Sequence, residues 1–393
     1  MLTRPTRLTR AKPSPAFSND IVVTHVLRSE YFDDPADLAR LPAVSRAMRN
    51  AVTGTGLRFE ELGEISAVNL GCLSALQRLQ RGGRLSRQEY LCYAAARSGQ
   101  LEELKALREN GCPWHEMTCM GAAMGGHLDV LQWARANSGP WNEKTCEGAA
   151  RGGQLEVLQW LRANGCPWDA ATCTEAAGGG YLDVLLWARA NGCPCDEKEL
   201  CVAAEKGHEV MVRALIDLGA VVNKAMDTGA TPLYVAAQNG HEAIVRTLFE
   251  LGADVNKARD DVETPLFIAA EKGHEAIVRA LMELGADVNK ERDGGVMPLY
   301  IAAQKGHEAV VRALIESGAD VNKAGDDGVT PLLIATHQGH DMVVRALMEL
   351  GADVNKATDD GVTALSIAVR EGHTAIVQIL RDAVLVQMQH LSL

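Results

Sequence analysis

The stretch DTGATPLYVAAQNGHEAIVRTLFELGADVN, from Asp227 to Asn256, decides the fold of this 393-residue chain. Its internal Gly-His pair recurs every 33 residues, at Gly207–His208, Gly240–His241, Gly273–His274, Gly306–His307, Gly339–His340 and Gly372–His373. Self-similarity at a fixed period of this length is typical of repeat architectures, in which each unit buries one face against the next. The sequence therefore predicts a solenoid rather than a single compact globule.

The front half of the chain repeats at 27 residues instead of 33. Two residue types mark this shorter period, at Trp114, Trp141 and Trp168 and at Cys92, Cys119, Cys146 and Cys173. The additional residues of the longer units fall in stretches such as GADVNKARDDVET, Gly252–Thr264, whose Asp, Asn and Gly residues are typical of tight turns. We expect a short hairpin finger in each longer unit and none in the shorter units.

Each unit is predicted to contain two short helices. Thr264 is a good N-cap for the first helix, Pro265 a good first residue, and Gly273 a good left-handed residue to end it. In the second helix Ile277 and Leu281 share one apolar face. Because helices this short are not stable alone, each must pack against its neighbours.

The cysteines and tryptophans of the front half raise the question of a metal or redox site. Their repetition favours packing instead. We expect Trp168, which precedes a possible N-cap at Asp169, to cover Cys173 as a hydrophobic staple. Asn142 and Asp196 hold the equivalent capping positions.

Neither disulfides nor metal binding is expected from the spacing of the cysteines. Equivalent positions in stacked helices lie about 8–10 Å apart, whereas the Cα atoms of a disulfide lie closer than about 7 Å. Cys193 and Cys195 could begin a metal site with Cys201, but no His lies in the preceding turn. We therefore expect no metal and no cofactor.

The composition of the chain limits the kinds of partner that it is expected to bind. The chain carries 39 Lys and Arg against 51 Asp and Glu, a net charge of −12, so we expect no general affinity for nucleic acid. No apolar run approaches the roughly 18 residues of a membrane span. The basic residues 1–18 are more typical of a disordered tail than of a mitochondrial targeting peptide, and without an apolar signal core we expect an intracellular protein, cytoplasmic or nuclear.

These residues resemble ankyrin repeats over roughly residues 65–385. Asp227–Asn256 is nearly a consensus unit, and the 27-residue units are similar to ankyrin units that lack the finger. The resemblance implies an all-α ankyrin-repeat solenoid of helix-turn-helix units with short β-hairpin fingers in the C-terminal half. One departure is that other residues replace the family's His after Thr-Pro-Leu, and there we expect more apolar packing. The replacements are Tyr234, Phe267, Tyr300, Leu333 and Ser366.

The resemblance also implies a non-enzymatic scaffold that binds a protein partner of unknown identity through the concave face and the fingers. Catalytic motifs are not expected: His274–Glu275 begins like a zincin helix, but Val278 occupies the second His position. The candidate partner-binding residues vary between units. At the finger tips they are Met226, Arg259, Glu291, Arg292 and Thr358, and at the ends of the first helices Gln238, Asn239, Glu271, Lys272, Gln304, Lys305, His337 and Gln338.

The segment before the repeats resembles an F-box, on the stretch DLARLPAVSRAMRNAV. That resemblance implies binding to a Skp1-type adaptor and the role of substrate receptor in a cullin (SCF) ubiquitin ligase. The candidate adaptor-binding residues are Ile21, Val22, Leu27, Leu38, Leu41, Val44 and Met48. The alternative is a helical cap that shields the first repeat. The expected segments are a basic tail at 1–18, the F-box-like or capping segment at 19–64, short repeats at 65–200, 33-residue repeats at 201–385 and a C-terminal tail at 386–393.

Overall fold

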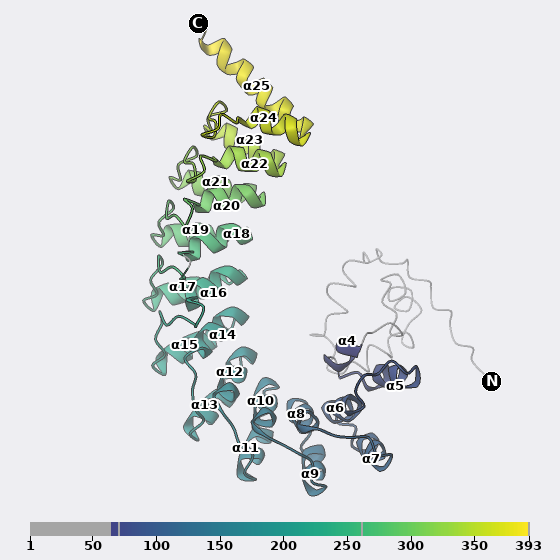
Figure 1. The fold of residues 1–393 in the computed structure, drawn as a ribbon. Coiled ribbons are helices and arrows are strands. Elements are labelled where there is room, and N and C mark those ends of the chain that lie inside the picture. The colour runs from purple at the N-terminus through teal and green to yellow at the C-terminus, as the bar shows by residue number, and fades with distance from the viewer. Residues whose placement is uncertain (1–63, 70, 261, 392–393) are drawn as a thin grey trace, which may run out of the picture. The chain divides into compact units, whose positions relative to one another are not determined.

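The computed structural model describes residues 64–69, 71–260 and 262–391, which fold almost entirely as short helices joined by turns (Figure 1). The predicted basic tail and the adaptor-binding candidates from Ile21 to Met48 lie outside these residues. The chain divides into two compact units, Met1–Trp168 and Asp169–Leu393. Successive helices form repeating pairs, which confirms the predicted all-α solenoid.

In the first unit, α8 packs between α6 and α10 to form an inner row. Each of these inner helices also packs against the outer helix that follows it. The described helices are α4 (Glu64–Asn69), α5 (Leu73–Arg81), α6 (Glu89–Arg97), α7 (Leu101–Glu109), α8 (Glu116–Met124), α9 (Leu128–Ala136), α10 (Glu143–Arg151) and α11 (Leu155–Ala163).

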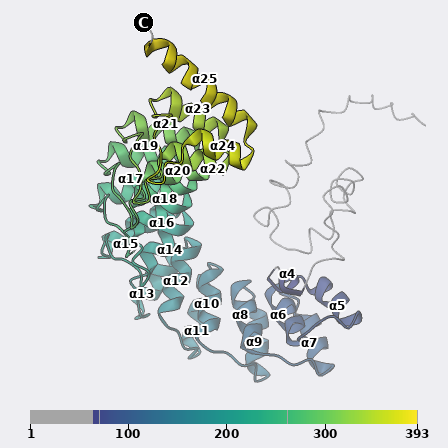
Figure 2. The ribbon, with the colours of Figure 1, turned by 45° about the horizontal axis from the view of Figure 1, so that its top comes forward.

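The second unit continues the same pairing, with each inner helix packed on the next inner helix and most outer helices packed on the next outer one (Figures 1 and 2). The inner helices are α12 (Ala170–Gly179), α14 (Glu199–Lys206), α16 (Pro232–Asn239), α18 (Pro265–Lys272), α20 (Pro298–Lys305), α22 (Pro331–Gln338) and α24 (Ala364–Glu371). The outer helices are α13 (Leu182–Ala190), α15 (Glu209–Asp217), α17 (Glu242–Glu250), α19 (Glu275–Glu283), α21 (Glu308–Glu316), α23 (Asp341–Glu349) and α25 (Thr374–Leu391).

Local capping chemistry sets the ends of the helices, as predicted. The Thr264 hydroxyl accepts a hydrogen bond from the backbone N–H of Phe267 at 3.1 Å, and Gly273 ends α18 with φ 77°. Asp169 caps α12 in the same way through the N–H of Ala171. Asp196 does not cap α14, since the chain first makes a turn in which its carboxylate accepts from the N–H of Lys198.

The fingers are present as tight turns that are too short for extended strands. Two backbone hydrogen bonds close each of several turns, such as those from Met226 N–H to the Ala230 carbonyl at 2.9 Å and from Gly229 N–H to the Met226 carbonyl at 2.8 Å. Among the described residues, β pairing is limited to isolated bridges, Arg292 with Val296 and Ala357 with Thr363. Each finger therefore reverses the chain with almost no ladder of its own.

The front-half tryptophans have arginine contacts that the sequence analysis did not predict. Trp114, Trp141 and Trp168 are only half-buried, whereas Cys119, Cys146 and Cys173 are fully buried. Each ring lies against a guanidinium, in the pairs Arg108–Trp114 at 4.4 Å, Arg135–Trp141 at 4.2 Å and Arg162–Trp168 at 4.1 Å. A large indole gains a cation–π contact at the surface, while the small thiol fits the core. All ten cysteines are free, including the Cys92–Cys119–Cys146–Cys173 series.

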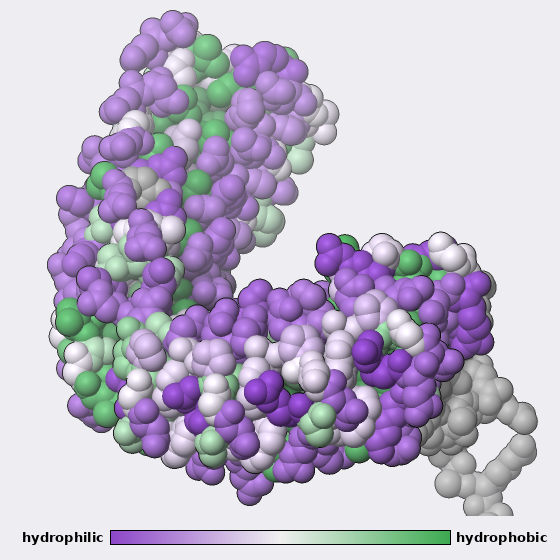
Figure 3. All heavy atoms as spheres, turned by 60° about the horizontal axis from the view of Figure 1, so that its bottom comes forward, coloured by the Kyte–Doolittle hydropathy of each residue, from purple (hydrophilic) through white to green (hydrophobic). Residues whose placement is uncertain are grey.

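Hydrophilic residues dominate the face of the molecule shown in Figure 3, and apolar residues occur there in small scattered groups. Exposed large apolar side chains in the described part include Ile65, Val210 and Val221. Within the described residues, no helix combines the length and the apolar character needed to cross a membrane.

Candidate functional site

A row of histidines fixes the ends of the inner helices in the second unit. The Nε2 of His307 lies 2.9 Å from the backbone carbonyl of Glu271, which belongs to the preceding 33-residue repeat. Because a carbonyl only accepts, this ring nitrogen must be the donor. Equivalent bonds join His274 to Gln238 at 3.1 Å, His340 to Gln304 at 2.9 Å and His373 to His337 at 3.2 Å.

The same rings cover the glycines that end the inner helices. A Cβ on Gly273 would lie 2.7 Å from the Nδ1 of His307, so this position combines a positive φ with close approach. In the sequence the Gly-His pairs only marked the period of the repeat. In the structure, the histidine of each following repeat binds the backbone at the end of an inner helix.

Eight of the candidate partner-binding residues occupy these helix ends, and we call them the helix-end row. All are exposed or half-buried. Among the described residues, the side chains of Gln238, Gln304 and Lys305 make no hydrogen bond or ion pair, while Lys272 pairs with the adjacent Glu271 at 3.4 Å. The row thus combines a fixed backbone with side chains that retain hydrogen-bonding capacity. Its members are Gln238, Asn239, Glu271, Lys272, Gln304, Lys305, His337 and Gln338.

The finger-tip candidates are less available than the sequence suggested. The Thr358 hydroxyl accepts a hydrogen bond from Val362 N–H within its own finger at 3.1 Å. Glu291 pairs with Lys323 of the next finger. Met226 is half-buried. These contacts do not exclude binding, but they reduce the number of free polar groups at the tips.

Arg259 and Arg292 contact a buried carboxylate as well as lying at the finger tips. Glu263 is 7% exposed, and its carboxylate accepts hydrogen bonds from the Tyr234 hydroxyl at 2.8 Å and from Arg292 Nη1 at 2.7 Å. Arg259 lies 3.8 Å from the same carboxylate, and its guanidinium lies 5.6 Å from the Tyr234 ring. Both arginines therefore neutralise one buried carboxylate.

This network adds polar contacts to the apolar packing that we expect after Thr-Pro-Leu. Tyr234 uses its hydroxyl to bind Glu263 of the next unit, and the ring of Phe267 lies 5.3 Å from the guanidinium of Arg292. A buried carboxylate needs such partners, because an unpaired buried charge is strongly unfavourable. Sequence reasoning missed Glu263, whose partners Tyr234 and Arg292 each lie 29 residues away.

The outer helices carry their charges in a continuous ladder. Arg279 binds Glu275 on its own helix at 2.9 Å and Glu316 on the next outer helix at 3.1 Å, and these hydrogen bonds raise the pKa of its guanidinium. The same arrangement recurs around Arg246 and Arg312. The outer surface therefore has its charged groups largely paired, in contrast to the helix-end row.

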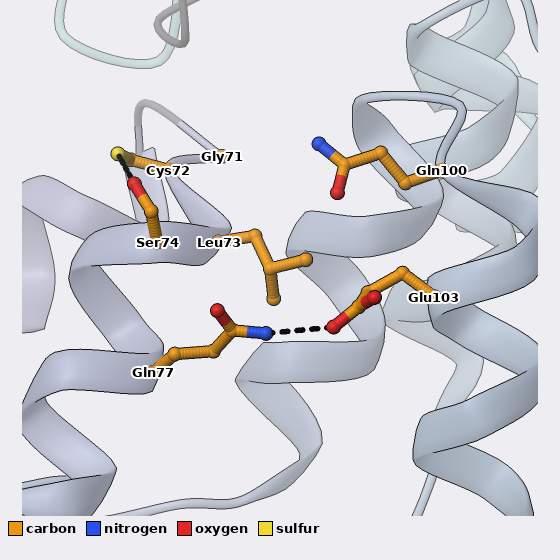
Figure 4. A pocket seen from close by; sticks show the side chains of 7 residues that line it. All are labelled: Gly71, Cys72, Leu73, Ser74, Gln77, Gln100 and Glu103. Atoms are coloured by element: carbon orange, nitrogen blue, oxygen red, sulfur yellow. Dashed lines mark hydrogen bonds between the residues drawn. The ribbon is translucent and has the colours of Figure 1, made fainter. Parts of the chain in front are cut away.

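A hollow near the start of the first unit does not have the character of a substrate site. It holds about 230 Å³, below the roughly 300–1,000 Å³ of most ligand pockets. Its lining between α5 and α7 is mainly polar, and a hydrogen bond from Gln77 to Glu103 at 2.8 Å crosses it (Figure 4).

Comparison with known protein families identifies the repeat. The family model described as ankyrin repeats (3 copies) matches residues 146–259, 256–325 and 322–388. No F-box match supports the segment at 19–64, so the ubiquitin-ligase alternative remains a prediction from that segment alone. None of the curated proteins compared matches the chain. Members of the matched family generally act as non-enzymatic interaction scaffolds. Because the matches cover more than half of its length, the chain belongs to the ankyrin repeat family.

Proposed function

We propose that this protein binds a protein partner through the helix-end row, with the finger tips at the edge of the contact. The observation that carries the proposal is the contrast between two surfaces of the second unit. The polar groups of the outer helices bind one another. The side chains of Gln238, Gln304 and Lys305 have no such partners among the described residues.

The histidine bonds support the proposal, because they hold the backbone of the row before any partner arrives. Side chains on a rigid backbone lose less conformational freedom on binding than side chains on a mobile loop. The amides of Gln238 and Gln304 can both donate and accept hydrogen bonds, and the exposed ammonium of Lys305 suits an acidic group on the partner.

The test uses two variants of the full chain with equal added charge. Gln238→Glu with Gln304→Glu replaces amide donors in the row by carboxylates, whereas Ala276→Glu with Ala309→Glu adds the same charge to exposed positions of the outer helices. Partners captured by the wild-type protein are identified by mass spectrometry, purified and titrated. The row variant should raise Kd at least about tenfold, or about 1.4 kcal/mol, and the outer variant should not. Equal affinity in the row variant, or a loss confined to the outer variant, would overturn the proposal.

A further inference from the structure

Cysteine pairs 20 residues apart recur in the 27-residue units, at Cys92 with Cys112, Cys146 with Cys166 and Cys173 with Cys193. The Sγ atoms of Cys92 and Cys112 lie 3.5 Å apart. In the later pair, the hydrogen bond between the two thiols raises the pKa of Cys173 and lowers that of Cys193. These pairs fill the core with small apolar groups, and packing alone accounts for them.

The third pair differs from the others in its surroundings. Where three earlier units carry Trp114, Trp141 and Trp168, this unit carries Cys195. Where they carry Thr118, Thr145 and Thr172, it carries Glu199. The Sγ atoms of Cys173 and Cys195 and a carboxylate oxygen of Glu199 all lie within 4.8 Å of one another. Two substitutions in one unit thus bring a third thiol and a carboxylate to an existing thiol pair.

We propose that Cys173, Cys195 and Glu199 bind one thiophilic divalent cation such as Zn²⁺, with a solvent molecule as the fourth ligand. Zinc binds thiolates at about 2.3 Å and carboxylates at about 2.0–2.2 Å in tetrahedral sites, which places neighbouring sulfurs about 3.8 Å apart. The observed donors are within about 1 Å of that spacing. On binding, each coordinating thiol releases its proton to solvent.

The surroundings of the donors fit such a site. Glu199 is 1% exposed, and its carboxylate accepts hydrogen bonds from Arg189 and from the Asp196 N–H at 3.3 Å, which orient it as outer-shell groups orient metal ligands. The guanidinium of Arg189 also offsets part of the negative charge that two thiolates would bring. Cys195 is exposed, so an ion can enter from solvent.

This site differs from the Cys193, Cys195 and Cys201 site that the sequence analysis considered. We did not expect that site to form. The Cys201 thiol faces the carbonyls of Lys224 and Ala230 in the next unit, at 3.8 and 3.9 Å. Its place is taken by Cys173, from the preceding inner helix, and by Glu199. The proposal is independent of the partner-binding surface.

The experiment titrates the reduced, chelator-treated full chain with Co²⁺ alone, followed by displacement with Zn²⁺. One Co²⁺ per chain should bind with a thiolate-to-cobalt charge-transfer band that Zn²⁺ abolishes. Cys195→Ser changes an exposed side chain, and it should weaken binding by at least about 100-fold, because outer-shell partners alone account for roughly 10–100-fold. Cys166→Ser and Cys201→Ser, which remove other buried thiols, should leave the affinity within about twofold of the wild-type value.

A second readout is independent of cobalt absorption. Zn²⁺ should slow hydrogen exchange in the segment from Cys193 to Cys201 of the wild-type chain and have no effect there in Cys195→Ser. Absence of the charge-transfer band would overturn the proposal. So would a band that persists in Cys195→Ser, or one that disappears in Cys201→Ser.

Discussion

Replacing Arg292 by Ala tests whether the network around Glu263 stabilises the contact between repeats. The change removes a 2.7 Å hydrogen bond to a carboxylate whose side chain is 9% exposed. Breaking a buried ion pair destabilises by about 3–5 kcal/mol, and a hydrogen bond to a charged group contributes about 1.5–3 kcal/mol. Since the Arg292 side chain is 39% exposed, water screens part of the interaction. We therefore expect a loss of about 2 kcal/mol.

Hydrogen exchange is the suitable assay, because stacked repeats need not unfold in one step. A loss of about 2 kcal/mol corresponds to roughly 30-fold faster exchange of protected amides, and we expect it in α16 and α18. As a control, Arg279→Ala breaks ion pairs between exposed side chains and should change exchange by no more than about twofold.

The double variant Arg292→Ala with Glu263→Gln distinguishes loss of charge pairing from loss of packing. Removing the carboxylate charge should recover part of the stability lost in Arg292→Ala, because the Tyr234 hydroxyl can still bind the amide. Glu263→Gln alone completes the cycle. If the stability losses of the two single variants simply add in the double variant, the residues are not coupled. That result, or unchanged exchange in Arg292→Ala, would refute the reasoning.

Three further predictions test other contacts. His307→Ala should destabilise the end of α18 by about 1–2 kcal/mol, as seen in its amide exchange, because it removes the 2.9 Å bond to the Glu271 carbonyl; unchanged exchange there would contradict this role. Burial raises the pKa of Cys119 and Cys201 from an ordinary value of 9.0 to about 12, so at pH 8 iodoacetamide should label Cys195 well before either, and equal labelling rates would contradict the burial. The stability gained by keeping those two thiols protonated is complete below pH 9 and is lost as the pH rises toward 12. Trp114→Ala should cost about 1 kcal/mol in urea unfolding, the scale of a surface cation–π contact, whereas Leu104→Ala, at a fully buried position, should cost about 3 kcal/mol; equal losses would show that Trp114 is a core residue.

The repeat and its helices could be predicted because their signals are local. Thr264, Pro265 and Gly273 specify the beginning and end of one helix within ten residues, and the next repeat carries similar signals. The helix-end row could be located for the same reason, since the end of each helix was known. Whether it binds a partner remains a prediction.

Contacts between repeats could not be predicted from the sequence, because they join residues that lie far apart in the chain. Glu263 meets Tyr234 and Arg292 only after the repeats stack. The arginine contacts of the tryptophans were missed for a related reason: the capping pattern around an apolar residue before an N-cap does not show that its ring will also meet a guanidinium. Cys173 and Glu199 likewise meet only in the folded chain.

The histidine bond has a consequence for how such a chain can change in length over evolution. Each ring binds a main-chain oxygen, and the residues that supply it differ, being Gln238, Glu271, Gln304 and His337. Every amino acid provides that oxygen, so the link does not depend on which unit comes before it. Recombination can therefore duplicate, delete or exchange whole 33-residue modules without breaking this joint. The exposed side chains at the same positions are then free to diversify, one module at a time.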